Sequence, residues 1–336
     1  MRHFKYSWFF TITSVLAAWF FLGFGAAITM IILIAIELAF SFDNAIINAK
    51  VLARLSPLWQ KLFLTIGMVV AIVGMRFVFP ILIVMVTAHL PWHEVIQSAL
   101  HDPKGYAEHL EEAHVAISAF GGSFLLTLSL YFLFDDKRKE LWLKRIERPL
   151  QRIGGKFWLP PLVASSIIAV VGLLHGREAL EAGLVGIGSY VLLHGFIELL
   201  GRFTGSTDSK APYLGWSAFV AFMYLQVLDA SFSFDGVLGA FAITDKIVLI
   251  ALGLGVGALW VRSLTVYMVR QGTLDAYIYL EHGAHYAILT LAGALLLSIF
   301  VPVPDAITGI IGLGVIGASF YASLQAIRQR PAPAKH

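Results

Sequence analysis

The sequence contains no cysteine among its 336 residues and is poor in charge, with only 13% Asp, Glu, Lys and Arg. The lack of cysteine excludes disulfides and thiolate metal sites. A soluble domain normally carries about 25% charged residues, so the low charge argues against a soluble fold.

Signatures of common enzymes are also missing: there is no phosphate-binding glycine loop ending in lysine, no nucleophile elbow and no His-Glu-x-x-His helix. We therefore expect no enzymatic activity and no required cofactor.

Apolar residues make up 58% of the chain and gather in long runs. A membrane-crossing helix needs about 20 mostly apolar residues, and its backbone polar groups must find partners within the segment. The runs do not alternate, which argues against a barrel. The pattern predicts an all-α polytopic membrane protein with about ten transmembrane helices, over residues 5–24, 27–53, 58–88, 112–134, 159–175, 178–201, 212–241, 246–269, 282–300 and 303–327.

The positive charges are distributed unevenly between the two ends of these helices. Most of the 24 Lys and Arg lie at the termini and in the connections after the second, fourth, sixth and eighth helices. The exceptions are Lys104, Arg177 and Lys246 in the other connections, and Arg76 and Arg262 inside predicted helices. The positive-inside rule then predicts cytoplasmic N- and C-termini. Because the basic residues flank apolar runs, no nucleic-acid partner is expected.

The connection over residues 135–158 is the most basic of the chain. It contains Lys137-Arg138-Lys139, followed by Lys144, Arg145, Arg148 and Arg152. This composition is typical of an interfacial amphipathic helix. A plain solvated loop explains the same residues, and the sequence leaves both interpretations open.

Two acidic motifs interrupt the apolar runs at matching places. Glu37 precedes Ser41-Phe42-Asp43-Asn44, and Asp229 precedes Ser233-Phe234-Asp235-Gly236 with the same spacing. Residues at i, i+4 and i+7 share a helix face, so Glu37, Ser41 and Asn44 line one stripe, and Asn48 extends it. Asp43 lies about 100° from that stripe in a regular helix. A break near Phe42 or Phe234 would bring the second acid of each motif to the stripe.

The motifs belong to a longer internal repeat. Arg76 and Arg262 each follow their motif by one predicted helix, a histidine follows at 114 and 285, and prolines then open a helix at 160 and 302. Five helices per copy is an odd number, so the two copies insert with opposite orientations, as in many secondary transporters. We predict residues 1–176, with the cytoplasmic connection 135–158, as the first repeat, 177–328 as the second, and 329–336 as a cytoplasmic tail.

Acids inside a membrane helix are costly and are functional by default. Arg76 and Arg262 are candidate counter-charges, and the surplus negative charge calls for a cation or a proton. Oxygen donors suit manganese, calcium and magnesium. A buried ion-pair network that fixes helix packing is the structural alternative. The predicted metal ligands are Glu37, Ser41, Asp43, Asn44, Asp229, Ser233 and Asp235.

His194 and Glu198 share a helix face at i, i+4 and form a candidate accessory metal site or proton path. Polar contacts at the helix end explain the same pair, and we prefer that interpretation.

The motif Glu37-x5-Asp43-Asn44, with Asp229-x5-Asp235 and Ala242-Ile243-Thr244 after it, resembles the TerC family of integral membrane proteins. An arginine in the next helix is also usual in that family. The chain departs in having Asp229 directly after Leu228, where many relatives have Glu-x-x-Asp, which suggests a divergent branch. The family is named for tellurium resistance, and several members are regarded as manganese exporters. The resemblance therefore implies a cation exporter of the bacterial inner membrane.

Two functions are consistent with these observations. A third, a membrane enzyme that uses a metal-bound water, is set aside because the sequence shows no further catalytic group. The first is a secondary transporter in the lipid bilayer that exports a divalent cation, Mn²⁺ or alternatively Ca²⁺, in exchange for protons. The second is a membrane scaffold that confers tellurite or envelope stress resistance without transport. The sequence does not determine the oligomeric state.

Overall fold

The computed structural model describes residues 4–329 except 71, 72, 75–77, 79, 80, 82–84, 86–89, 204–212, 214, 242 and 245. Within these residues all regular secondary structure is helical, apart from one isolated bridge between Leu55 and Tyr213. The predicted all-α class is therefore confirmed. The helices are α1 (Lys5–Leu22), α2 (Phe24–Phe40), α3 (Phe42–Leu52), α4 (Pro57–Leu64), α5 (Ile66–Val69), α7 (Trp92–His101), α8 (Pro103–Glu112), α9 (His114–Leu133), α10 (Lys144–Ile153), α11 (Leu159–His175), α12 (Arg177–Phe203), α13 (Trp216–Phe241), α14 (Ile247–Gln271), α15 (Thr273–Ala276), α16 (Leu280–Ser298) and α17 (Asp305–Gln329).

Several of these helices are long and apolar enough to cross a membrane. Five qualify singly by length and composition among the described residues, and a sixth crossing results if α2 and α3 count as one bent span. Large apolar side chains on the outside are strongly exposed, including Phe20 at 84% and Leu173 at 87%, as expected for lipid-facing positions. The protein is thus helical and membrane-embedded, but the described residues do not confirm ten crossings.

The predicted secondary structure differs from the structure in two segments, a predicted helix and the connection that follows it. The predicted helix 58–88 is interrupted at Thr65 between α4 and α5, and much of its second half lies outside the described residues. The connection 89–111 was predicted without helices, yet it forms α7 and α8. Local capping explains α8, because the Asp102 side chain accepts a hydrogen bond from the Gly105 N–H at 3.2 Å.

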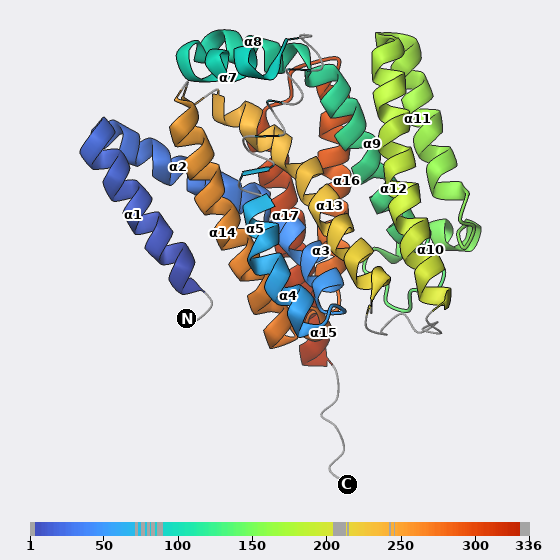
Figure 1. Cartoon of the computed structure of the whole chain (residues 1–336). Helices are drawn as coiled ribbons and strands as arrows, with labels where there is room; N and C mark the ends of the chain where they lie inside the picture. The colour runs from blue at the N-terminus through green and yellow to red at the C-terminus, as the bar shows by residue number, and fades with distance from the viewer. Residues whose placement is uncertain are drawn as a thin grey trace.

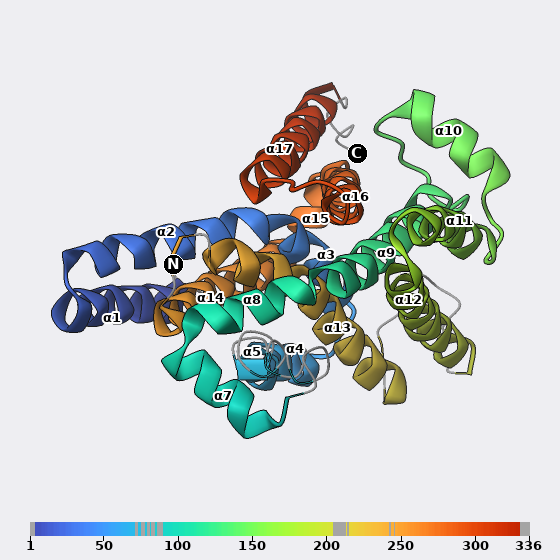
Figure 2. The ribbon, with the colours of Figure 1, turned by 90° about the horizontal axis from the view of Figure 1, so that it is seen from above.

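Helices from the two halves of the sequence are interleaved in the bundle. α2 packs along α14, while α9 packs against both α12 and α16 (Figure 2). The α2–α14 contact is close because α14 offers glycine there: a Cβ at Gly257 would lie 2.5 Å from Cβ of Glu37. Small residues of this kind let helices approach closely in lipid. The first acidic motif is therefore held directly against the second half of the chain.

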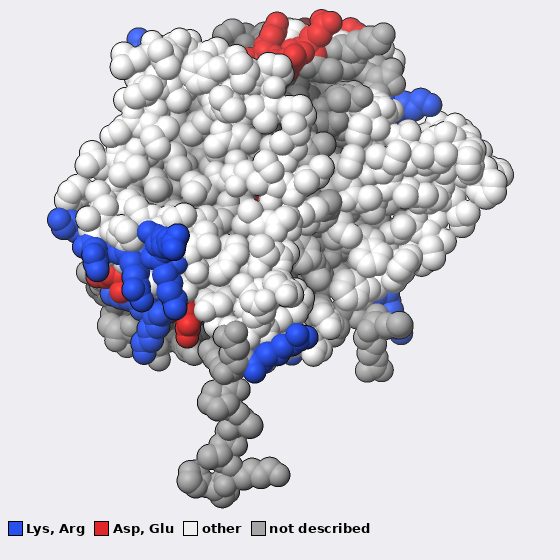
Figure 3. All heavy atoms as spheres, turned by 180° about the vertical axis from the view of Figure 1, so that it is seen from behind, with Lys and Arg blue, Asp and Glu red and all other residues white. Residues whose placement is uncertain are grey.

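The two ends of the bundle differ in charge. The start of α1, the end of α17, α10 and α15 lie at one end, and α7 and α8 lie at the other (Figure 1). From behind, most Lys and Arg gather at the end with α10, and the largest group of Asp and Glu lies at the opposite end (Figure 3). The predicted separation of basic and other connections is thus visible in three dimensions.

Candidate functional site

A helix break lies at the centre of the first acidic motif. α2 ends at Phe40, α3 begins at Phe42, and the two segments are bent by 51°. Ser41 at the junction has φ −98° and ψ 15°, outside the regular helical range. Broken spans of this kind are tolerated in membranes only where protein or a cavity covers the backbone. A break is therefore present near Phe42, one of the two positions considered from the sequence.

The polar side chains of the break are buried. Glu37, Ser41, Asp43 and Asn44 are each less than 10% exposed. Ser41 Oγ donates to Glu37 Oε1 at 3.1 Å, so these two residues share a face as predicted. The backbone N–H of Asn44 donates to Asp43 Oδ1 at 2.9 Å. The motif thus presents carboxylate, hydroxyl and amide oxygens within one turn of the break.

The two acidic motifs meet through Asn44 and Asp229. Asn44 Nδ2 donates to Asp229 Oδ1 at 2.8 Å, which joins α3 to α13. Asp229 Oδ2 lies 2.7 Å from Arg262 Nη2 on α14. Arg262 also donates to the Phe63 carbonyl oxygen at 2.8 Å and stacks 4.2 Å above the Phe63 ring. Arg262 therefore forms an ion pair with Asp229, and its role as a counter-charge at a metal site stays a prediction.

The second motif is arranged differently from the first. α13 runs as one helix from Trp216 to Phe241, so the alternative break at Phe234 does not occur. The side chains of Ser233 and Asp235 lie outside the described part of the structure. Arg76 also lies outside the described residues, and its predicted role as a counter-charge stays a prediction.

His194 lies among aromatic rings on α12. Its ring centroid is 4.7 Å from that of Tyr131 and 5.6 Å from that of Tyr190. The predicted partner Glu198 has a side chain outside the described part of the structure. His194 thus packs within an aromatic cluster, and both interpretations of the pair His194 and Glu198 stay predictions.

Two buried amides extend the site, and one of them was missed by the sequence analysis. Gln226 on α13 is 4% exposed, and Asn48 on α3 is 1% exposed. Among the described residues no donor reaches Asn44 Oδ1, Asn48 Oδ1 or Gln226 Oε1. Buried acceptors without donors are costly, and a bound cation would satisfy them. Gln226 lies three residues before Asp229, so the i, i+3 spacing on one helix face was the available signal.

The described part of the site does not complete a metal cluster. Among the residues whose positions are described, no group of three or more His, Cys, Asp or Glu is placed to hold a metal ion. The oxygen-rich set of carboxylates and amides nevertheless has the donor chemistry of hard cations. The arrangement is a buried polar junction between α2, α3, α13 and α14, with one acid neutralised by Arg262.

Comparison with known proteins gives one family match. The family described as "Protein of unknown function (DUF475)" matches residues 42–330, which include α3, α13 and α14 but not α2. No curated protein and no solved structure matches the chain. The resemblance to the TerC family stays a prediction.

Proposed function

We propose that this chain, which belongs to the DUF475 family, is a secondary transporter that exports a divalent metal cation in exchange for protons. The observation that carries the proposal is the broken α2–α3 span, whose buried polar residues meet Asp229 of α13. In secondary transporters, substrate sites lie near the midplane on interrupted helices. Mn²⁺ is the preferred substrate and Ca²⁺ the alternative.

The charge of the junction supports a cation as substrate. Three carboxylates, those of Glu37, Asp43 and Asp229, lie in this region, and Arg262 balances the last of them through a direct ion pair. Asp43 is 6% exposed, so its ionised form is costly without a cation or a proton. Competition between metal and protons for the same oxygens would couple the two fluxes.

The proposed architecture is two inverted five-helix repeats, 1–176 and 177–328, that rock against each other. The contacts between α2 and α14 and between Asn44 and Asp229 join the two proposed repeats. Relative movement there would open the junction to each side in turn. The basic end of the bundle, where α1 starts and α17 ends, is proposed to face the cytoplasm of a bacterial inner membrane.

Transport into proteoliposomes tests the proposal. The wild-type protein is expected to carry Mn²⁺ in response to a pH gradient, and Asp43→Asn is expected to abolish the flux. Glu181→Gln is the matched control, because Glu181 is an exposed acid on α12 that pairs with Arg177 outside the site. Equal Mn²⁺ flux in Asp43→Asn and Glu181→Gln would show that Asp43 does not bind the transported cation.

One observation favours the scaffold function as a second candidate. The chain of contacts from Asn44 through Asp229 and Arg262 to Phe63 ties α3, α4, α13 and α14 together, as a structural ion-pair network would. A ligand that binds only the folded state raises stability by RT ln(1 + [L]/Kd). Thermal unfolding with Mn²⁺, Ca²⁺, Mg²⁺ and Zn²⁺ separates the candidates, since a scaffold should show no metal-specific shift.

A further inference from the structure

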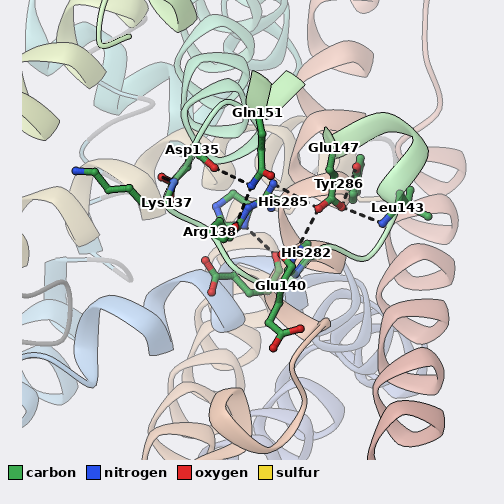
Figure 4. A network of polar contacts seen from close by, with 11 residues as sticks. Asp135, Lys137, Arg138, Glu140, Leu143, Glu147, Gln151, His282, His285 and Tyr286 are labelled. Atoms are coloured by element: carbon green, nitrogen blue, oxygen red, sulfur yellow. Dashed lines mark hydrogen bonds and ion pairs between the residues drawn. The ribbon is translucent and has the colours of Figure 1, made fainter. Parts of the chain in front are cut away.

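The helix α10 contacts the rest of the bundle through a buried carboxylate, that of Glu147. Glu147 is 0% exposed, and its Oε1 accepts hydrogen bonds from the Leu143 N–H at 3.1 Å and from the Tyr286 hydroxyl at 3.3 Å. Its Oε2 lies 3.4 Å from Arg138 Nη2 (Figure 4). Because Tyr286 belongs to α16, these contacts hold α10 against the second half of the chain.

Further contacts fix the rotation of α10 about its axis. Gln151 Nε2 donates to the carbonyl oxygens of Asp135 at 2.9 Å and Arg138 at 3.1 Å (Figure 4). Leu150 packs against the main hydrophobic core. Burial lowers the pKa of the Arg138 guanidinium, and the neighbouring Glu147 raises it. The face of α10 with Glu147, Leu150 and Gln151 therefore packs against the rest of the protein, and the other faces of the helix point outward.

One outward face of α10 is apolar. Successive helix residues are rotated by about 100°, which places Ile146, Pro149 and Ile153 within about 60° of each other. Ile146 is 50% exposed and Ile153 is 56% exposed. Removing apolar surface from water is favourable by about 25 cal/mol per Å². An apolar phase that covers these exposed isoleucine side chains would therefore stabilise α10 in this position.

The remaining face of α10 is basic. The same rotation places four exposed side chains on it, and they are Lys144, Arg145, Arg148 and Arg152. Figure 3 shows a cluster of Lys and Arg at the level where α10 lies in Figure 1, directly below a broad surface without charge. A basic strip beside an apolar strip is the pattern of helices that lie in a membrane interface.

The position of α10 in the chain agrees with such an interface. It connects the C-terminal end of α9 to the N-terminal end of α11, and both are apolar helices. Phe157 and Trp158 immediately precede α11 and are 47% and 56% exposed. Lys156 Nζ lies 5.5 Å from the centroid of the Trp158 ring. Exposed aromatic and basic residues at a helix entrance are typical of the headgroup level.

We propose that α10 lies in the membrane–water interface and binds anionic phospholipid headgroups through Lys144, Arg145, Arg148 and Arg152. The strip of Ile146, Pro149 and Ile153 enters the boundary of the acyl chains. An acidic protein partner fits less well, because it would leave this apolar strip unexplained. The lipid site is independent of what the acidic junction transports.

Lipid binding to the purified full-length protein tests the headgroup contacts. Phosphatidylglycerol and phosphatidylcholine are titrated separately in detergent, and bound lipid is counted by native mass spectrometry. Each Lys or Arg near an anionic surface contributes about 1 kcal/mol, which is about fivefold in affinity. The triple variant Lys144→Gln/Arg145→Gln/Arg148→Gln is therefore expected to lose about a hundredfold in affinity for phosphatidylglycerol.

The control removes three positive charges from other segments at the same end of the bundle, as Lys61→Gln/Arg270→Gln/Arg328→Gln. All three residues are exposed. This variant is expected to keep phosphatidylglycerol binding within a few fold of wild type. Equal loss in both variants, or equal binding of phosphatidylglycerol and phosphatidylcholine by the wild type, would overturn the proposal.

A spin label tests the depth of the helix in the membrane. Because the chain has no cysteine, Ile153→Cys and Arg145→Cys each create one labelling site without further changes. In liposomes that contain phosphatidylglycerol, the label at 153 is expected to collide mainly with oxygen from the lipid phase. The label at 145 is expected to collide mainly with a water-soluble nickel reagent. Equal exposure of both labels to the nickel reagent would show that α10 lies in bulk water.

Discussion

The ion pair between Asp229 and Arg262 should make a large contribution to stability. Arg262 is 3% exposed and Asp229 is 15% exposed, so neither charge is well solvated in the folded protein. Asp229→Asn removes the negative charge but keeps the size of the side chain. The guanidinium stays in place, because Arg262 also donates to the Phe63 carbonyl oxygen. The variant therefore removes the carboxylate of this ion pair, while the buried cation remains.

Removing one partner of a buried ion pair costs about 3–5 kcal/mol. The partial exposure of Asp229 places our expectation at the lower end, about 3 kcal/mol. Arg262→Gln should cost a similar amount, because Asp229 then keeps only the Asn44 amide among these partners. The double variant Asp229→Asn/Arg262→Gln removes both charges of this ion pair, so its cost should be smaller than the sum of the two single costs by about 1–3 kcal/mol.

Equilibrium unfolding in mixed micelles measures the four free energies of unfolding in this cycle. Helical content by circular dichroism is followed as the denaturing detergent is increased. A cost below about 0.5 kcal/mol for Asp229→Asn, within the range of surface substitutions, would refute the ion pair. Strictly additive single costs would show that the two side chains do not interact in solution.

The remaining predictions concern contacts between helices. Gly257→Ala should destabilise the α2–α14 contact by about 1–3 kcal/mol, because the new Cβ would meet Glu37. Gly293→Ala is the control, since its Cβ meets no atom within 4 Å, and it should be neutral or stabilising in the same unfolding assay. Lys50→Gln should cost less than about 1 kcal/mol, because Lys50 is 53% exposed in its ion pair with Glu281. A Lys50→Gln cost as large as that of Gly257→Ala would contradict this ranking.

Much of the architecture could be predicted because apolar runs in a membrane protein have few alternatives. A backbone in lipid must form helices, so the predicted ranges 112–134 and 159–175 closely match α9 and α11. The connection 89–111 is different, because its residues are polar and carry no long apolar period. There, local capping by Asp102 and packing of Val95, Ala99 and Tyr106 produce helices.

Pairings across the bundle could not be read from the sequence. The acid, hydroxyl and amide of the first motif were evident from their spacing, and so was the arginine one helix after the second motif. That Asn44 donates to Asp229, and that Gln226 lies buried beside them on α13, depends on which helices pack together. Whether two side chains on different helices contact each other depends on the distance between those helices in space, which the spacing of residues along the chain does not give.

The sequence by itself determined the helical class, the two acidic motifs and the concentration of basic residues in alternate connections. These follow from hydrophobic runs and from helix periodicity, which are local. Only the tertiary structure decided that the chain breaks at Ser41 but not at Phe234, and that Arg262 pairs with Asp229. Only the tertiary structure also showed which face of α10 the buried Glu147 fixes against the bundle. The physical reason is that burial and pairing of charged groups depend on contacts between segments far apart in the chain.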